Sequence, residues 1–180
     1  MGQIGSRLLP DDFHSCLQAI VEGSYDFLLT FHHPNVPILL EPELYPHIVM
    51  GTDTLVAVRS PMLAAGVNDT ASLPLLSYAP NSFLGRVATF AQAQAGAPSV
   101  HVAHTNENAM AEALKFMALE GHGLAWLPRS LVARELEEAS LVIVGPEIPL
   151  EIRLYRSARR TRPVVEKVWN AARLLAPETM

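Results

Sequence analysis

Polar side chains that can hydrogen-bond a small ligand occur where apolar strand patterns end and helical patterns begin. Thr30, Phe31 and His32 close one buried strand, and Asn81 and Ser82 precede a helical pattern. A second helix start is preceded by Thr105, Asn106 and Asn108. Helix N-termini carry free N–H groups and the positive end of the helix dipole, so we expect these residues to bind a small neutral molecule or monoanion. Helix capping is the alternative role for each polar one, since Ser, Thr and Asn are preferred caps.

Two sulfur-containing residues are candidate redox sensors. Met110 follows Asn106 and is expected on an apolar helix face, where a sulfoxide would insert a polar group. Cys16 is expected on the inner side of an amphipathic helix, where a thiol behaves as a small hydrophobe. Ordinary core packing is the alternative interpretation for both residues.

The sequence predicts no catalytic, metal or cofactor site. It contains no GxSxG, P-loop, HExxH, CxxC or GxGxxG pattern, and residues 121–123 (GHG) have the position of a turn that ends a helix. Four of the seven histidines occur in close pairs, but with a single cysteine and no nearby carboxylate cluster they do not predict a three- or four-ligand metal site. These pairs are His32 with His33 and His101 with His104.

Composition predicts a globular protein of the cytoplasm. The 180 residues are 49% hydrophobic and only 17% charged, and no apolar run approaches the roughly 18 residues of a membrane span. Residues 1–13 do not have the regions of a secretory signal, and the lone cysteine cannot form an internal disulfide. A net charge of −5 argues against nucleic-acid binding by this chain itself, because phosphate contacts require a basic surface.

Hydrophobic periodicity predicts an α/β fold in which strands alternate with helices. The first set is a strand at Ile4–Leu9, a helix at 13–22 and a strand at 25–31, forming a βαβ unit. A second set of alternating strands and helices spans 75–138, and a final helix covers 164–175. Strands at 48–59, 141–144 and 148–155 are expected to join two lobes by a double crossover. A cleft between the lobes is the expected place for the polar residues above.

Several segments resemble one protein family. The stretch 121–128 (GHGLAWLP), preceded by a helical pattern and followed by Ser130, resembles the second lobe of the effector-binding domain of LysR-type transcriptional regulators. Residues 74–78 (PLLSY) and 81–86 (NSFLGR) narrow the resemblance to the branch that includes the hypochlorite-responsive regulator. Residues 23–31 (GSYDFLLTF) fit the first-lobe pattern of a glycine, an aspartate and an apolar strand.

The resemblance implies a type 2 periplasmic-binding-protein-like fold that lacks its first strand and first helix. Lobe I would comprise residues 1–58 and 148–180, and lobe II residues 59–147. The family's DNA-binding winged helix-turn-helix is not in this sequence, so DNA would be a partner only through a domain not present in this chain. A homodimer or higher homo-oligomer is also implied, with the second-lobe half of its interface formed by one side of the helix at 82–94, namely Phe83, Val87, Phe90 and Ala91.

The predicted function is therefore an effector-binding or oxidant-responsive sensory domain without catalytic activity. A stand-alone solute-binding protein of the same fold is one alternative, against which the missing export signal argues. A transferase or deaminase on a related two-lobed scaffold is another, but it needs an acid or base in the cleft, and only His32 offers one.

Overall fold

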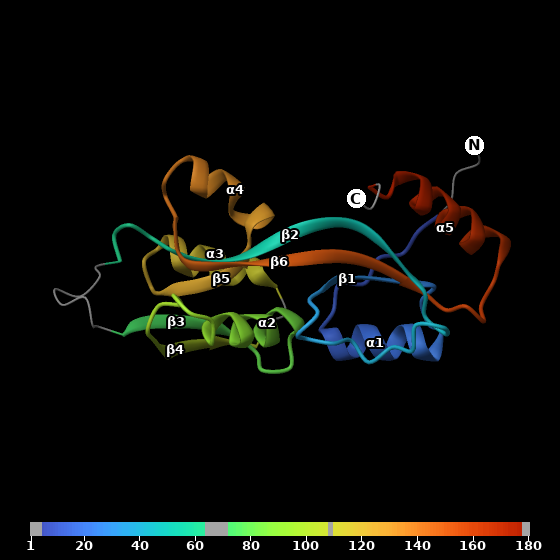
Figure 1. The fold of residues 1–180 in the computed structure, drawn as a ribbon, viewed down its shortest axis with the longest axis horizontal. Coiled ribbons are helices and arrows are strands. Elements are labelled where there is room, and N and C mark those ends of the chain that lie inside the picture. Colours follow the sequence, from blue (N-terminus) through green and yellow to red (C-terminus); the bar gives the residue numbers. More distant parts are fainter. Residues whose placement is uncertain (1–4, 64–71, 108–109, 178–180) are drawn as a thin grey trace. The chain divides into compact units, whose positions relative to one another are not determined.

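A computed structural model describes residues 5–63, 72–107 and 110–177, and it contains alternating helices and strands (Figure 1). The helices are α1 (Phe13–Glu22), α2 (Phe83–Gln92), α3 (Ala111–Leu119), α4 (Arg129–Glu137) and α5 (Pro163–Leu175). The strands are β1 (Phe27–His32), β2 (His47–Arg59), β3 (Leu73–Tyr78), β4 (Val100–Asn106), β5 (Leu124–Pro128) and β6 (Val142–Arg156). No helix in the described ranges is both long and apolar enough to cross a membrane.

The six strands are hydrogen-bonded in the order β1-β6-β2-β5-β3-β4. β1 pairs antiparallel with β6, and β2 pairs antiparallel with β5. β3 pairs parallel with both β4 and β5, as expected when helices connect neighbouring strands. The alternation of strands and helices predicted from the sequence is therefore observed.

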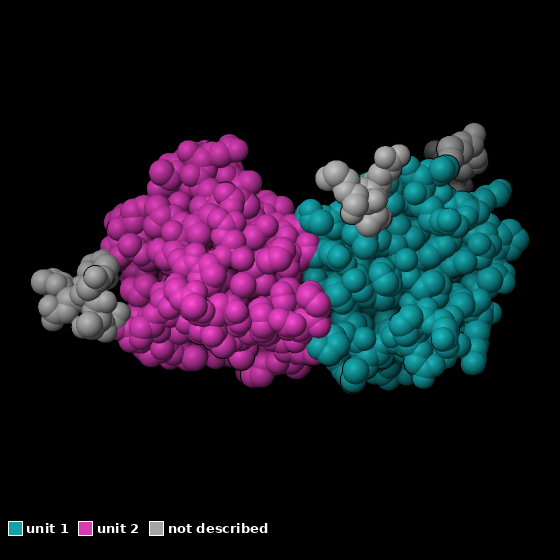
Figure 2. All heavy atoms as spheres, viewed as in Figure 1, with its two compact units in different colours: residues 1–32, 37–52, 151–180 teal, residues 33–36, 53–150 magenta. Residues whose placement is uncertain are grey.

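The chain divides into two compact units, coloured separately in Figure 2. Unit 1 comprises residues 1–32, 37–52 and 151–180, and unit 2 comprises residues 33–36 and 53–150. β2 and β6 are long enough to contribute residues to both units, with 13 and 15 residues. Each unit has its own hydrophobic core, around Ile20, Leu28 and Tyr155 in unit 1 and around Val56, Leu114 and Leu127 in unit 2.

Helix α1 begins and ends where the sequence predicts, because both ends have local signals. The Asp12 carboxylate accepts hydrogen bonds from the Ser15 backbone N–H at 3.0 Å and from its hydroxyl at 2.6 Å, and these bonds lower the pKa of Asp12. Gly23 ends the helix in the left-handed conformation, with φ of 83°.

In unit 2 the apolar side of α2 packs inward. Ser82 caps the helix, and Phe83, Val87 and Ala91 are all buried within the described chain. Three of the four residues expected at a dimer interface are therefore buried within the chain, and the fourth, Phe90, is partly buried. The ordinary role of an amphipathic helix, which covers its own sheet, accounts for the pattern.

Trp126 on β5 is the largest fully buried side chain of unit 2. Its side chain is 1% exposed, and its indole N–H donates a 3.1 Å hydrogen bond to Gln92 on α2. The Tyr78 hydroxyl donates to the Trp126 backbone carbonyl at 2.9 Å, and burial raises the pKa of Tyr78. At the start of β5, Gly123 approaches the Pro74 carbonyl so closely that a Cβ there would lie 2.6 Å from its oxygen. This glycine lets β5 lie against β3.

The predicted strand at Ile4–Leu9 is not observed. Ile4 lies outside the described residues, and residues 5–9 form neither helix nor strand. Among the described strands β1 has β6 as its one neighbour, so the predicted parallel pairing in a βαβ unit is not observed either. Leu8 is 88% exposed and Leu9 43%. A segment with neither a hydrogen-bonded neighbour nor a buried face gains little from strand structure.

Two further boundaries differ from the prediction. The strands expected at 141–144 and 148–155 form one strand, β6, which continues through Gly145 with φ of 84°. Helix α3 begins at Ala111 and not near Asn106, and its cap residue Met110 makes no side-chain capping hydrogen bond. The parallel pairing of β4 with β3 extends through Asn106, which keeps these residues extended.

Candidate functional site

The predicted polar residues of unit 2 come together at one end of the β3–β4 pair. Ser77 is opposite Thr105 and Tyr78 is opposite Asn106 in the register of these parallel strands. α2 begins at Phe83, only five residues after β3 ends. The carboxyl ends of both strands and the N-terminus of α2 therefore lie in the same region of unit 2, which is where open α/β sheets bind ligands.

Ser82 is a helix cap, as the alternative interpretation expects. Its Oγ accepts a 2.9 Å hydrogen bond from the Gly85 N–H, and the residue is 9% exposed. Asn81 lies in the preceding turn and is exposed. The cap satisfies one N–H of the first turn, and an exposed amide lies beside it.

Thr105 and Asn106 end a strand and do not open a helix. Thr105 is exposed, and the side-chain amide of Asn106 donates a 3.3 Å hydrogen bond to the Met110 carbonyl. This contact joins the end of β4 to the start of α3. Asn108 lies outside the described residues.

The three predicted residues of unit 1 are the last residues of β1. Thr30, Phe31 and His32 are all partly buried and pair with β6 residues, His32 with Glu151. The His32 Nδ1 lies 3.6 Å from the Glu151 carboxylate, which also forms a 2.7 Å ion pair with Arg153. The carboxylate is therefore neutralised by arginine, and the end of β1 carries a mixture of hydroxyl, aromatic and imidazole groups.

A cavity of about 360 Å³ lies in unit 2 between α2 and β3, but none of the predicted ligand residues lines it. Its wall includes Leu75, Ala88, Val102 and Trp126. The lining residues closest in sequence to predicted ones are Tyr78, Gly85 and Val102, each three positions away, and the Tyr78 hydroxyl is already bonded to the backbone. The structure thus separates the polar strand ends from this mainly apolar cavity.

His33, which sequence reasoning treated only as part of a histidine pair, is a core residue of unit 2. It is 5% exposed, its ring lies 4.8 Å from that of Phe90, and its Nδ1 accepts a hydrogen bond from the Asn35 N–H. Burial lowers the pKa of His33, so the ring stays neutral. In the sequence His33 lies between an apolar strand pattern and Pro34, and neither neighbour indicates that its ring is buried.

Sequence reasoning also missed the pairing of Asp53 with the start of α4. The Asp53 carboxylate accepts hydrogen bonds from the Ser130 backbone N–H at 3.2 Å and from its hydroxyl at 2.5 Å. An acceptor that comes from a strand 77 residues away in the sequence cannot be recognised from local spacing.

The two candidate redox residues differ in access. Met110 is 52% exposed and caps α3, so it does not lie on an apolar helix face as expected. Cys16 packs against the unit 1 core, and burial raises the pKa of its thiol. Thiolate is the reactive form of cysteine, and the raised pKa keeps Cys16 in the less reactive thiol form.

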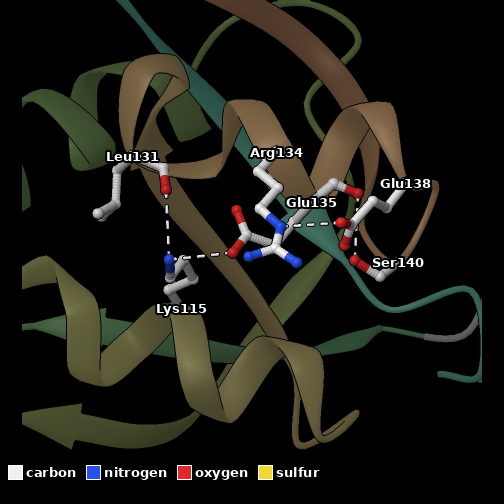
Figure 3. Close-up of polar contacts among 6 residues, drawn as sticks. All are labelled: Lys115, Leu131, Arg134, Glu135, Glu138 and Ser140. Atoms are coloured by element: carbon white, nitrogen blue, oxygen red, sulfur yellow. Dashed lines mark hydrogen bonds and ion pairs between the residues drawn. The ribbon is translucent and has the colours of Figure 1, made fainter.

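A polar contact between α3 and α4 is more enclosed than the others on these helices (Figure 3). Lys115 Nζ lies 3.1 Å from the Glu135 carboxylate and 3.5 Å from the Leu131 carbonyl, and the two charged side chains are only 16% and 15% exposed. The bond from Lys115 lowers the pKa of Glu135. The neighbouring Arg134–Glu138 pair is mostly exposed. Both ion pairs lie in unit 2, where they connect or stabilise helices α3 and α4.

Among the residues that the structure describes, no group of three or more His, Cys, Asp or Glu side chains is placed to hold a metal ion.

Comparisons with known proteins agree on one family. The model of the LysR substrate binding domain matches residues 3–176. The HTH domain-truncated transcriptional regulator QseD of Escherichia coli O157:H7 is 29% identical over 170 residues, which cover 91% of this chain and 68% of that protein. The HTH-type transcriptional regulator YjiE of E. coli K12 is 29% identical over 174 residues, and the chain spans only about half of its length, 54%.

Solved structures give the same result. The apo regulatory domain of HypT from Salmonella typhimurium has a TM-score of 0.76 and 25% identity, covering 92% of this chain and 79% of that one. Its bromide-bound form has a TM-score of 0.75 and 26% identity, covering 92% and 79%. Full-length HypT, a hypochlorite-specific LysR-type regulator, has a TM-score of 0.73 and 25% identity, covering 92% and 57%. The predicted type 2 periplasmic-binding-protein-like fold and the predicted resemblance are confirmed.

Proposed function

Because this chain belongs to the LysR substrate-binding-domain family, we propose that it senses a small effector through the polar strand ends described above. Units 1 and 2 would correspond to the two regulatory lobes of such a domain. The family is one of transcriptional regulators, and we propose that this chain itself has no catalytic activity.

The observation that carries this proposal is the convergence of polar groups at one end of unit 2. The last residues of β4, Thr105 and Asn106, lie opposite the last residues of β3, and the capped start of α2 follows β3 directly. N–H groups in the first turn of a helix and amide side chains bind small anions and neutral polar molecules well. Thr30, Phe31 and His32 are the residues we propose for unit 1, with Asn81, Ser82 and Asn108 completing the set.

The class of effector is a small monoanion or a small neutral molecule. Few lysine or arginine residues occur near these strand ends in the sequence, which disfavours a polyanion. HypT, which is similar to this chain over 92% of its length, has been solved with a bromide ion bound. A halide is therefore a suitable probe of the proposed site.

Replacing Asn106 by alanine is expected to weaken bromide binding by about 1–2 kcal/mol, the scale of one hydrogen bond and an unpaired partner. Bromide NMR line broadening in chloride-free buffer measures this binding directly. Asn170→Ala is the matched control, because Asn170 is an exposed asparagine on α5 in unit 1. Equal broadening by the wild type and by Asn106→Ala, with both folded, would contradict the assignment. Ser82→Ala is a less clean test, since it also removes the α2 cap.

Response to an oxidant is a second proposed input. HypT is hypochlorite-specific, and in this chain Met110 presents a half-exposed thioether that is joined to Asn106 through its own carbonyl. We propose that oxidation of Met110 alters this hydrogen bond and so the position of Asn106 at the end of β4.

Mild hypochlorite is expected to oxidise Met110 before Cys16. Met110 is 52% exposed, whereas the pKa of Cys16 is raised by burial and little thiolate forms. Peptide mass spectrometry measures both, with the 88% exposed Met62 as a positive control and the partly buried Met117 as a protected one. Preferential oxidation of Cys16, or protection of Met110 while Met62 reacts, would rule out Met110 as the sensor.

The remaining partners are part of the same proposal. We propose that DNA is contacted only through a domain not present in this chain, that the chain self-associates as a homodimer or higher homo-oligomer, and that it acts in the cytoplasm. QseD and YjiE, its relatives, are transcriptional regulators, which supports a DNA-linked role. The buried side of α2 is not available as the interface.

A further inference from the structure

Strand β4 carries two histidines, His101 and His104, that the proposed effector site does not use. β4 is an edge strand of the sheet, with β3 as its hydrogen-bonded neighbour (Figure 1). Both histidines are exposed, and so are the residues between them. Side chains alternate between the two faces of a regular strand, so a spacing of three residues would place the histidines on opposite faces.

A β-bulge in β4 brings the two histidines to the same face. His101 is opposite Pro74, and His104 is opposite Leu76. The register shifts between Leu75 and Leu76, so β4 has one residue more than β3 over this stretch. Pro74 and Leu76 are two positions apart and share one face of β3, and their partners on β4 therefore share that face as well. The two histidines are thus adjacent side chains on one exposed surface.

A hydrogen bond orients one of the two rings. The Nδ1 of His101 lies 3.3 Å from the hydroxyl oxygen of Ser72, the residue before β3. Histidines that bind metals commonly make such a bond through the ring nitrogen that does not contact the metal, because the bond fixes the orientation of the ring. A ring that donates from Nδ1 keeps a lone pair on Nε2, which is the form that a metal ion requires.

The charges around the pair favour a cation over an anion. Neither β3 nor β4 contains a lysine or an arginine, so no fixed positive charge on these strands repels a metal ion. Unit 2 as a whole has more Asp and Glu than Lys and Arg residues, and its negative field raises the local concentration of cations. Neutral imidazole binds copper, nickel and zinc ions well, and among these divalent ions Cu²⁺ binds most tightly.

We propose that His101 and His104 form a two-histidine site for a divalent transition-metal ion, with Cu²⁺ as the preferred ion. Each imidazole supplies one nitrogen ligand, and water molecules complete the coordination. A site with only two protein ligands is weaker than a closed structural site, and it remains open to solvent.

Copper titration of the full chain, followed by pulsed electron paramagnetic resonance, tests this site. At one Cu²⁺ per chain in a non-coordinating buffer, the spectrum should show two bound imidazoles. His101→Ala and His104→Ala should each leave one imidazole and weaken Cu²⁺ binding by at least about tenfold, because the second nitrogen of a pair binds intramolecularly. His122→Ala, which removes another exposed histidine of unit 2, should leave the affinity unchanged.

Moving one histidine to the other face tests the geometry with an unchanged number of histidines. His104→Ala combined with Val102→His places the second imidazole opposite Leu75, on the face away from His101. This double variant should bind Cu²⁺ no more tightly than His104→Ala alone. Ser72→Ala should weaken binding by up to about tenfold, because the ring of His101 loses the bond that orients it.

Three results would each overturn the proposal. They are a wild-type spectrum with a single imidazole, equal affinities of His101→Ala and His122→Ala, and recovery of the affinity lost in His104→Ala when Val102→His is added. The substituted side chains are all exposed, so the variants should fold, and circular dichroism checks this. Neither histidine is among the residues proposed for the effector, so bromide binding and copper binding can fail separately.

Discussion

Replacing Trp126 by alanine is expected to lower the free energy of unfolding of unit 2 by about 3–5 kcal/mol. The side chain is 1% exposed, and its removal leaves a large void among residues that cannot fully close it. The change also removes the indole donor from Gln92, whose own amide donates to the Pro98 carbonyl. Urea unfolding followed by circular dichroism measures the loss as a lower midpoint.

Phe116→Ala is the matched control for this prediction. Phe116 is also an aromatic residue of unit 2, but it is 62% exposed on α3, so its truncation should change the unfolding free energy by no more than about 0.5 kcal/mol. Trp126→Phe should fall between the two, because it keeps most of the volume and loses the hydrogen bond. If Trp126→Ala and Phe116→Ala had equal midpoints, the described packing of β5 would be incorrect.

Replacing Lys115 by methionine is expected to destabilise unit 2 by about 1–3 kcal/mol. The substitution removes the cation from a carboxylate that is only 15% exposed and whose Oε2 is buried without a hydrogen-bond partner among the described residues. A charge left unpaired in such a place costs more than the ion pair itself contributes. Adding Glu135→Leu should therefore restore much of the loss, and thermal unfolding of the single and double variants measures this coupling.

The same pair predicts a pH dependence. Lys115 lowers the pKa of Glu135 in the folded protein, so its stabilisation is complete above the ordinary glutamate pKa. It is lost as the pH falls through the lowered folded value. The stability of Glu135→Gln should consequently fall less steeply in acid than that of the wild type. Arg134→Met breaks the exposed pair in Figure 3 and removes only the smallest of the causes that lower the pKa of Glu135, so it should change the acid profile much less, and a change equal to that of Glu135→Gln would contradict this explanation.

Local signals made much of the fold predictable. Asp12 and Gly23 bound α1, Ser82 caps the start of α2, and the apolar run within β2 places the strand within one residue of its observed limits. In each case the stabilising group lies within a few residues of the boundary. The family resemblance rested on similarly local patterns, such as residues 121–128 around Gly123.

The wrong predictions concern segments whose structure is determined by contacts with residues distant in the sequence. Asn106 remains extended because β4 pairs with β3, and no capping residue marks the start of α3 at Ala111. Residues 5–9 end in two leucines but have no hydrogen-bonded neighbour in the described sheet. The site prediction had the same limit: the residue types at strand ends were informative, whereas the burial of His33 and the pairing of Asp53 with Ser130 depend on the folded chain.

The pairing of β1 with β6 affects how the protein is made. During synthesis β1 emerges early, but the strand to which it is hydrogen-bonded comes more than a hundred residues later, with Leu28 paired to Tyr155. Residues 53–150, nearly all of unit 2, are translated after β1 and before its partner residues in β6, and they can fold while β1 is still unpaired. Until the last strand arrives, the apolar side chains of β1 remain without their partner, and a nascent chain paused in this interval would depend on chaperones to avoid aggregation.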